Sequence, residues 1–145
     1  MIKEKTFVNT HEINRIANEL DNLYHHAALK LNLSDSAMFV LYTIYENGRK
    51  CPLNKICSSG ICKQTINSAL RKLEDEEILY LEQYNGKSKL VLFTEKGIQF
   101  ARQTIARLLD AEENVYCDWE QEEIDMYIKL NRKYLEKFKE QIEKM

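Results

Sequence analysis

The chain has 145 residues, of which 44% are hydrophobic and 30% are charged, and its formal net charge is −2. This length fits one domain, and its single proline and four glycines favour helix over turn-rich structure. The longest uncharged apolar run, residues 37–45, is too short to span a bilayer, so we expect no membrane partner. We also expect a cytoplasmic location, because no export leader opens the chain, and free thiols rather than disulfides for the four cysteines.

The small net charge conceals a strong segregation of charge along the chain. Six cations and no acid lie between Arg49 and Lys72. Eight acids and no Lys or Arg lie between Asp110 and Asp125. The first segment is suited to face a polyanion, and the second is typical of a solvated acidic surface.

The first third of the chain predicts two helices. Apolar residues recur at three- and four-residue steps from Ile13 to Leu31, as in an amphipathic helix. Ser34 can cap a second helix that ends near Asn47-Gly48, where glycine can adopt the left-handed conformation. Because this second helix is apolar on more than one face, we expect it at the centre of the core.

A helix-turn-helix is predicted in the acid-free segment. Pro52 suits the first turn of a short helix, and Ser58-Ser59-Gly60 signals a turn. The next helix, predicted from Cys62 to Glu77, has an apolar stripe that includes Ile66 and Leu73, and a polar, cationic opposite face. Two short helices joined by a tight turn, the second polar outside, are typical of this motif.

A β-hairpin follows the predicted recognition helix. Residues 79–84 and 89–93 are rich in aliphatic and aromatic side chains, which favours strands. Asn85-Gly86 between them is a strong hairpin signal, because both residues tolerate positive φ. Lys87 and Lys89 lie at or just after the tip, so the hairpin has the character of a basic wing.

Two more helices are predicted towards the C-terminus. Thr94 can cap a long helix whose apolar stripe runs from Ile98 to Leu108. A last helix carries a seam close to a heptad repeat, with Asn131 as a polar member that can fix register. Since the terminal helices have no obvious partner inside so small a domain, we expect them to pack on a second subunit. The expected dimer-interface residues are Ile13, Ile16, Leu20, Ile124, Ile128, Leu135, Phe138 and Ile142.

Several motifs in this order resemble the MarR (multiple antibiotic resistance regulator) family. They are Leu33-Ser34, the stretch 63–70, Leu73-Glu74, and the stretch 92–97 after the hairpin. The resemblance implies a mainly α (α+β) fold: a winged helix-turn-helix with a two-stranded wing and N- and C-terminal dimerisation helices. It implies one domain over residues 1–145, with the winged part at about 34–97 and dimerisation helices at about 8–32 and 98–145. Such proteins act as homodimers on pseudo-palindromic operators, with half-sites about one helical turn (~34 Å) apart, and more often repress than activate.

Two departures from the family pattern stand out. Many members carry an Asp-Arg-Arg type sequence in the wing, where arginine reaches the minor groove. The wing here, residues 85–89, contains no arginine. Contact between its lysines and DNA phosphates is still expected, but the arginine contact in the minor groove is in doubt. Glu76-Glu77 also occupies a turn where members often have glycine.

A double-stranded DNA partner would be recognised by two kinds of contact. Gln64 and Asn67 can each pair with adenine through two hydrogen bonds, and Arg71 can do so with guanine. The residues expected to contact the phosphate backbone are Lys55, Lys63, Thr65, Ser68, Lys87 and Lys89.

Other functions receive less support from the sequence. Cys62 is a redox candidate, because a helix N-terminus beside Lys63 lowers a thiol pKa, although an inert role is the commoner one. A small-molecule effector pocket is a second hypothesis, weighed against an ordinary core role for its wall residues Tyr24, His25, Met38, Tyr42 and Tyr45. Catalytic, cofactor and metal motifs are not found, so we expect neither an enzyme nor a cofactor or metal site. A winged-helix module that binds a protein instead of DNA remains the alternative, and the absence of acids from Arg49 to Lys72 argues against it.

Overall fold

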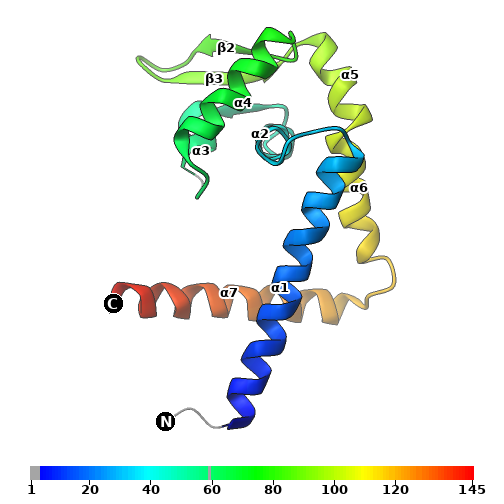
Figure 1. Ribbon diagram of the computed structural model, residues 1–145, viewed down its shortest axis with the longest axis vertical. Helices are drawn as coiled ribbons and strands as arrows, with labels where there is room; N and C mark the ends of the chain where they lie inside the picture. The colour runs from blue at the N-terminus through cyan, green and yellow to red at the C-terminus, as the bar shows by residue number, and fades with distance from the viewer. Residues whose placement is uncertain (1–3, 59) are drawn as a thin grey trace. The chain divides into compact units, whose positions relative to one another are not determined.

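The computed structural model describes residues 4–58 and 60–145, and it describes side chains from residue 9 onward. Its contacts form two compact units, one ending at Leu108 and one beginning at Leu109, and each is described by itself. The elements in chain order are α1 (Glu4–Lys30), α2 (Asp35–Glu46), β1 (Lys50–Pro52), α3 (Leu53–Cys57), α4 (Lys63–Asp75), β2 (Leu79–Gln83), β3 (Lys89–Phe93), α5 (Glu95–Gln103), α6 (Ile105–Val115) and α7 (Gln121–Glu143) (Figure 1).

Both predicted side-chain caps are present. Ser34 Oγ accepts a hydrogen bond from the amide of Ala37 at 3.1 Å, at the start of α2. Thr94 Oγ1 accepts from the amide of Gly97 at 2.8 Å, at the start of α5. Gly48 has a φ of +81° just after α2, so the predicted end of that helix is also confirmed. In each case a local hydrogen bond or a conformational preference explains why the sequence is sufficient to place the helix end.

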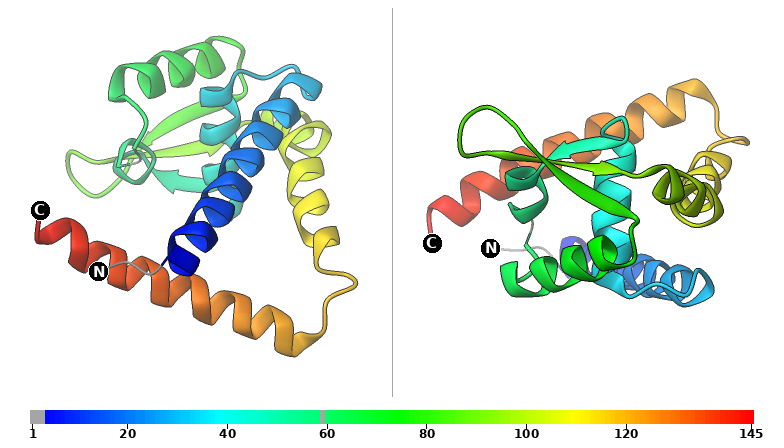
Figure 2. Two further views of the ribbon diagram at one scale, coloured as in Figure 1. Left: turned by 60° about the horizontal axis from the view of Figure 1, so that its bottom comes forward. Right: turned by 90° about the horizontal axis from the view of Figure 1, so that it is seen from above.

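A three-stranded antiparallel sheet with the order β1-β3-β2 forms the wing and its base. The hairpin pairs Leu79 with Phe93 and Gln83 with Lys89, close to the predicted strands. The tip of the hairpin points away from α5 in every view (Figures 1 and 2).

The strand β1 was not predicted, because three residues show no readable alternation. Cys51 pairs with Val91, and both are fully buried. The prediction for Pro52 was wrong in detail: it ends β1 and precedes α3 as its cap residue, instead of lying in the first helical turn. Tertiary pairing with β3 therefore holds this proline extended.

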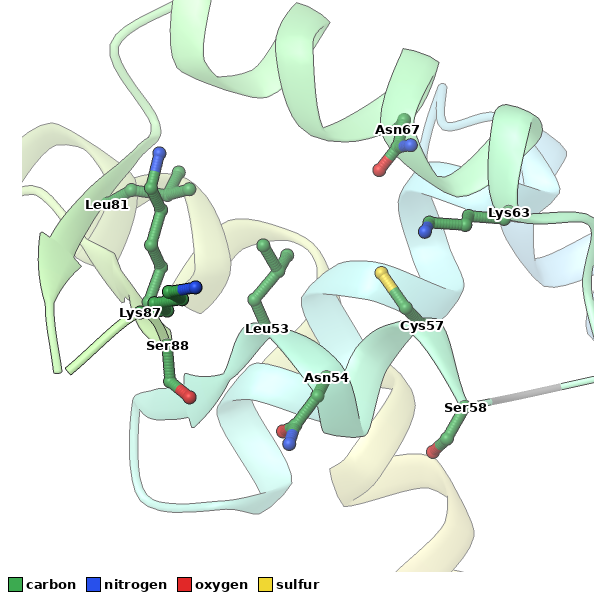
Figure 3. Close-up of a pocket in the computed structure, with 10 residues that line it drawn as sticks. Leu53, Asn54, Cys57, Ser58, Lys63, Asn67, Leu81, Lys87 and Ser88 are labelled. Carbon is green, nitrogen blue, oxygen red and sulfur yellow. The ribbon is translucent and has the colours of Figure 1, made fainter. Parts of the chain in front are cut away.

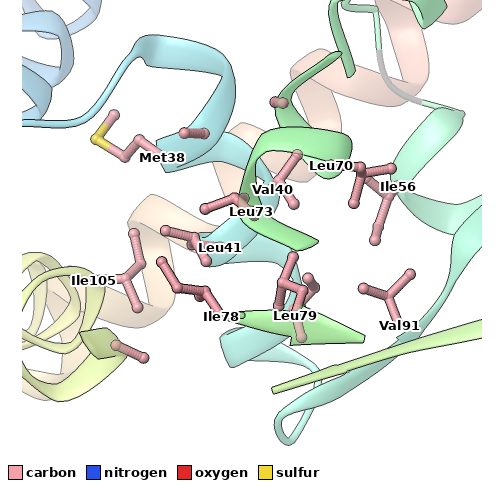
Figure 4. Packing of buried hydrophobic residues seen from close by; sticks show 14 of the residues in the cluster. Met38, Val40, Leu41, Ile56, Leu70, Leu73, Ile78, Leu79, Val91 and Ile105 are labelled. Atoms are coloured by element: carbon pink, nitrogen blue, oxygen red, sulfur yellow. The ribbon is translucent and has the colours of Figure 1, made fainter. Parts of the chain in front are cut away.

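The core of the first unit is centred on α2, as its apolar faces predict. Val40, Leu41 and Ile44 have no exposed surface. They face the inward stripe of α4, which contributes Leu70 and Leu73 (Figure 4). The helix-turn-helix and the sheet are thus held on one hydrophobic cluster. Its buried members are Ala28, Ala37, Met38, Val40, Leu41, Ile44, Cys51, Ile56, Ile66, Ala69, Leu70, Leu73, Ile78, Leu79, Val91, Phe93, Ala101 and Ile105.

The prediction of one long helix after Thr94 was wrong. The backbone leaves helical geometry at Thr104 (φ −122°, ψ −88°), so that α5 and α6 are separate helices. The hydroxyl of Thr104 donates to the carbonyl of Phe100 at 2.7 Å, and Ile105 is fully buried directly after the break. The apolar stripe continues across the break, which is why periodicity gave no sign of it.

The second unit contains the rest of α6 and α7. A capping box between Glu120 and Glu123 starts α7. Trp119 makes edge-to-face contacts with Tyr116 and Tyr127, with ring centroids 4.9 and 5.4 Å apart. The amide of Asn131 donates to the carbonyl of Tyr127 at 2.7 Å, so it is engaged within its own helix.

Along the described residues, no helix combines the length and the apolar character that crossing a bilayer requires.

Candidate nucleic-acid interface

The helix α4 has the two faces that the sequence predicts, although it is slightly shorter than predicted. Ile66, Ala69, Leu70 and Leu73 are buried against the core. The opposite face is exposed and carries no carboxylate as far as Lys72; its members there are Lys63, Gln64, Thr65, Ser68, Arg71 and Lys72. The exposed acids Glu74 and Asp75 follow in the last turn of the helix. Asn67 lies beside this face and is half-buried. Burial of one stripe thus presents an array of cations, amides and hydroxyls to solvent.

The cations of this region are not neutralised by carboxylates. Among the described residues, the salt bridges involve Arg15, His25 and Lys137, and none involves α3, α4 or the hairpin. The lysines and the arginine of these elements are therefore not held in ion pairs with described carboxylates of the chain.

Two of the residues predicted to contact the DNA phosphate backbone already make hydrogen bonds within the protein. The ammonium of Lys55 donates to Asn47 Oδ1 at 2.5 Å, and the hydroxyl of Ser68 donates to the carbonyl of Gln64 at 3.0 Å. The single hydroxyl proton of Ser68 would have to leave that bond before it could be donated to a phosphate oxygen. The ammonium of Lys55 has two further protons, but its bond to Asn47 holds it in place on the protein. We therefore rank Lys55 and Ser68 below Lys63, Lys87 and Lys89 as phosphate contacts.

The tip of the hairpin has the positive φ angles that Asn-Gly predicts, +47° at Asn85 and +78° at Gly86. The amide of Tyr84 donates to the carbonyl of Ser88 at 2.9 Å and closes the turn. The side-chain amide of Gln83 donates to the carbonyl of Gly86. The wing is therefore a short hairpin whose tip is held by its own hydrogen bonds.

A groove of about 670 Å³ separates the hairpin from the helix-turn-helix. Lys63 and Asn67 of α4 point into it, towards Cys57 of α3, and Lys87 and Ser88 lie on the hairpin side (Figure 3). Its described lining contains three lysines and no carboxylate: Leu53, Asn54, Cys57, Ser58, Lys63, Asn67, Leu81, Lys87, Ser88 and Lys89. The groove could accept an anionic group from a partner.

Comparisons with known proteins identify the fold. Neither a family model nor a curated protein sequence matches the chain. A MarR family regulator from Neisseria meningitidis superposes with a TM-score of 0.80 at 15% identity, over 94% of this chain and 97% of that one. This chain has the MarR winged-helix fold.

Two further structures with the MarR fold were solved with DNA. One is a MarR family transcriptional regulator of Streptomyces coelicolor, with a TM-score of 0.73 at 14% identity, covering 94% of this chain and 89% of that one. The other, from Listeria monocytogenes, is assigned to MarR family regulators and was solved with a 26mer DNA. It has 26% identity and a TM-score of 0.66, covering 88% of this chain and 87% of that one.

Within this MarR fold, the thiol of Cys62 lies at the start of α4 and is exposed. The backbone amides of Gln64 and Thr65 hold its pKa below the ordinary value for cysteine. Burial raises the pKa of the Cys51 thiol, and nearby Lys55 opposes that rise. The sequence-based expectation for Cys62 thus has a physical basis, while its redox role stays a hypothesis.

The candidate effector residues do not share one environment. Met38 is buried in the core, and Tyr42 and Tyr45 pack against that core, with the Tyr45 ring edge-on to Phe93. Exposed His25 contacts both carboxylate oxygens of Asp35, at 2.9 and 3.0 Å, and Tyr24 is also exposed. For Met38, Tyr42 and Tyr45 these contacts favour the core role over a ligand-binding one.

The residues expected at a dimer interface are exposed within the single chain. Ile13, Ile16 and Leu20 on α1 are 61%, 50% and 46% exposed. On α7, Ile124 is half-buried, and Ile128, Leu135, Phe138 and Ile142 are each about half exposed. Rows of large apolar side chains left in water are typical of a surface that another chain covers.

Proposed function

We propose that this protein is a sequence-specific, DNA-binding transcriptional regulator that acts as a homodimer. The exposed face of α4 carries this proposal. It combines the amides and guanidinium that pair with base edges and the cations that pair with phosphates, on a helix whose other face is fixed in the core. The DNA complexes of two proteins with the same fold support it.

The base contacts belong to Gln64, Asn67 and Arg71 in this proposal. A good bidentate contact discriminates between bases by about 1–3 kcal/mol, so loss of one side chain relaxes specificity at one position. Lysines at the start of α4 and in the hairpin supply affinity that depends on salt.

The proposed homodimer forms through α1 and α7. Two copies of α4 then meet a two-fold symmetric operator, as the symmetry of a homodimer requires. A dimer bound over a promoter blocks access to it, so we infer repression rather than activation.

The first test is a fluorescence-anisotropy titration of a labelled pool of random duplexes at several salt concentrations. We expect salt-dependent binding by the wild type and weaker binding by Arg71→Ala. Arg102→Ala, which removes an exposed arginine from α5, is the matched control and should bind as the wild type does.

Two results would count against the proposal. If a folded dimer bound no DNA at low salt, under reducing conditions and without added ligand, the protein-binding role would be favoured instead. If Arg71→Ala and Arg102→Ala lost affinity equally, α4 would not be the recognition element.

A further inference from the structure

The cations of the hairpin face the helix-turn-helix. Lys87 and Lys89 line the same groove as Lys63 and Asn67 of α4, together with the hydroxyl of Ser88 (Figure 3). Three lysines, one from α4 and two from the hairpin, therefore line one groove, and no carboxylate lies among its described lining residues. Such an arrangement is suited to a single anion held between the two elements.

The tip of the hairpin has little with which to read a DNA minor groove. Asn85 and Gly86 occupy it, and the side chain of Gln83 is engaged with the Gly86 carbonyl. Contacts in a narrow minor groove usually rely on an inserted cation, most often arginine, and residues 84–89 contain no arginine.

The exposed surface of α4 divides into two stripes, and only one of them lines the groove. Because successive residues turn by about 100° along a helix, Gln64, Ser68 and Arg71 share one stripe, and Lys63 and Asn67 lie on the neighbouring stripe. Only the second stripe lines the groove. We therefore reassign Asn67 from the base contacts of the proposed function to the group of anion-facing lysines, and base contacts are left to Gln64 and Arg71.

We propose that this groove seats a phosphate group of the DNA backbone between α4 and the hairpin, and that the hairpin contributes affinity without reading bases. The inference rests on the proposed DNA-binding function and specifies how the wing takes part in it. Lysine donates to phosphate oxygens as a compact charge, and the Asn67 amide and Ser88 hydroxyl add further donors. These contacts are the same for every sequence.

The test uses Lys87→Gln/Lys89→Gln in the full-length chain. The matched control is Lys30→Gln/Lys129→Gln, which removes two exposed lysines that do not line the groove. Anisotropy titrations against salt give the slope of log Kobs against log[salt]. We expect the groove variant to lose roughly one unit of slope per lysine and the control to keep the wild-type slope.

A selection from a random duplex library, run with the same proteins, tests the second half of the proposal. We expect the groove variant to select the same base preferences as the wild type. Gln64→Ala should relax the preference at one position in each half-site. Asn67→Ala should weaken binding to all sequences equally.

The outcomes separate this inference from the proposed function. If the wild type binds no DNA, both fail. If the wild type binds DNA but the groove variant keeps the wild-type slope, or changes base preferences next to the half-sites, only the inference fails.

Free phosphate is the other source of the same chemical group. We titrate the wild type and the groove variant with inorganic phosphate at constant ionic strength and without DNA, and follow the amide signals of the groove residues by NMR. Shifts that do not saturate even at high phosphate concentration support the DNA backbone as the occupant. Saturation at low phosphate concentration that the groove variant loses would overturn that assignment in favour of a soluble anion.

Discussion

At the scale of single residues, Glu77 shows how this chain tolerates a departure from the family pattern. It lies just beyond α4 with a φ of +61°, in the left-handed region that favours glycine. The amide of Glu77 donates to the carbonyl of Glu74, and that of Ile78 donates to the carbonyl of Leu73, both at 2.9 Å. These bonds close the end of α4 and hold Glu77 in a conformation that suits its side chain poorly.

Replacing Glu77 with glycine should therefore stabilise the fold. A non-glycine residue in the left-handed conformation costs the folded state about 1–2 kcal/mol, and glycine removes that cost. Because glycine also gives the unfolded chain more conformational freedom, we expect the free energy of unfolding to rise by about 1 kcal/mol. Urea denaturation of Glu77→Gly at fixed protein concentration measures the change. Glu76→Gly is the control: Glu76 has a φ of −80°, so glycine there should destabilise.

The thiol of Cys62 is expected to be more reactive than that of Cys51. Its lowered pKa gives it more thiolate at neutral pH, and it is exposed, whereas Cys51 is fully buried and its pKa is raised. Alkylation with iodoacetamide, followed by peptide mass spectrometry over a pH series, should label Cys62 first and slow as the pH falls through its pKa. Equal rates for the two cysteines would contradict the proposed environment of Cys62, and Cys62→Ser should remove the rapidly labelled peptide.

At the scale of elements, the start of α5 is fixed by a close approach to the segment that follows α4. The amide of Thr94 donates to the carbonyl of Ile78 at 3.1 Å, and its hydroxyl donates to the carbonyl of Glu77 at 2.5 Å. Gly97 is buried, and a Cβ added there would lie 1.9 Å from the Ile78 carbonyl oxygen. The glycine in the stretch 92–97 is therefore explained by packing against the backbone.

Gly97→Ala should destabilise the protein, although alanine is the better helix former. The collision is with backbone, which cannot move aside as a flexible side chain could, and overpacking of this kind costs about 1–3 kcal/mol. Gly60→Ala is the control, since a Cβ there meets no atom within 4 Å. Thermal unfolding of both variants measures the difference, and a Gly97→Ala protein as stable as the wild type would disprove the close packing.

Sequence patterns located most elements because each relies on a local cause. The Ser34 and Thr94 caps, Gly48, the Asn85-Gly86 turn and the buried stripe of α4 all involve neighbours in the chain. β1 and the break at Thr104 were missed, because one needs a strand partner distant in sequence and the other interrupts an apolar stripe that continues unchanged.

At the scale of the whole molecule, the apolar surfaces of α1 and α7 predict assembly. Leu135 and Phe138 are 52% and 49% exposed, and Phe138 stacks only on Tyr134 of its own helix among the described ring contacts. We expect Leu135→Asp/Phe138→Asp to yield a folded monomer, because carboxylates cannot be buried in an apolar interface without a large penalty. Analytical ultracentrifugation gives the mass, and circular dichroism shows whether the monomer is folded.

Lys133→Asp is a suitable control for the dimer test. It lowers the net charge by the same two units and lies on the polar side of α7, opposite the seam. We expect it to remain a dimer. A stable dimer from the double variant would show that α7 does not form the interface.

The amino-acid sequence by itself determined the helix-turn-helix, the hairpin, the cationic face of α4 and the apolar seams of the terminal helices. Periodicity, caps and turn residues act over a few positions, so they can be read along the chain. Only the tertiary structure decided that Lys87 and Lys89 share a groove with Lys63, that Lys55 and Ser68 are engaged elsewhere, and that Met38 belongs to the core. Those facts depend on which distant segments pack together, and no local pattern in the sequence records that packing.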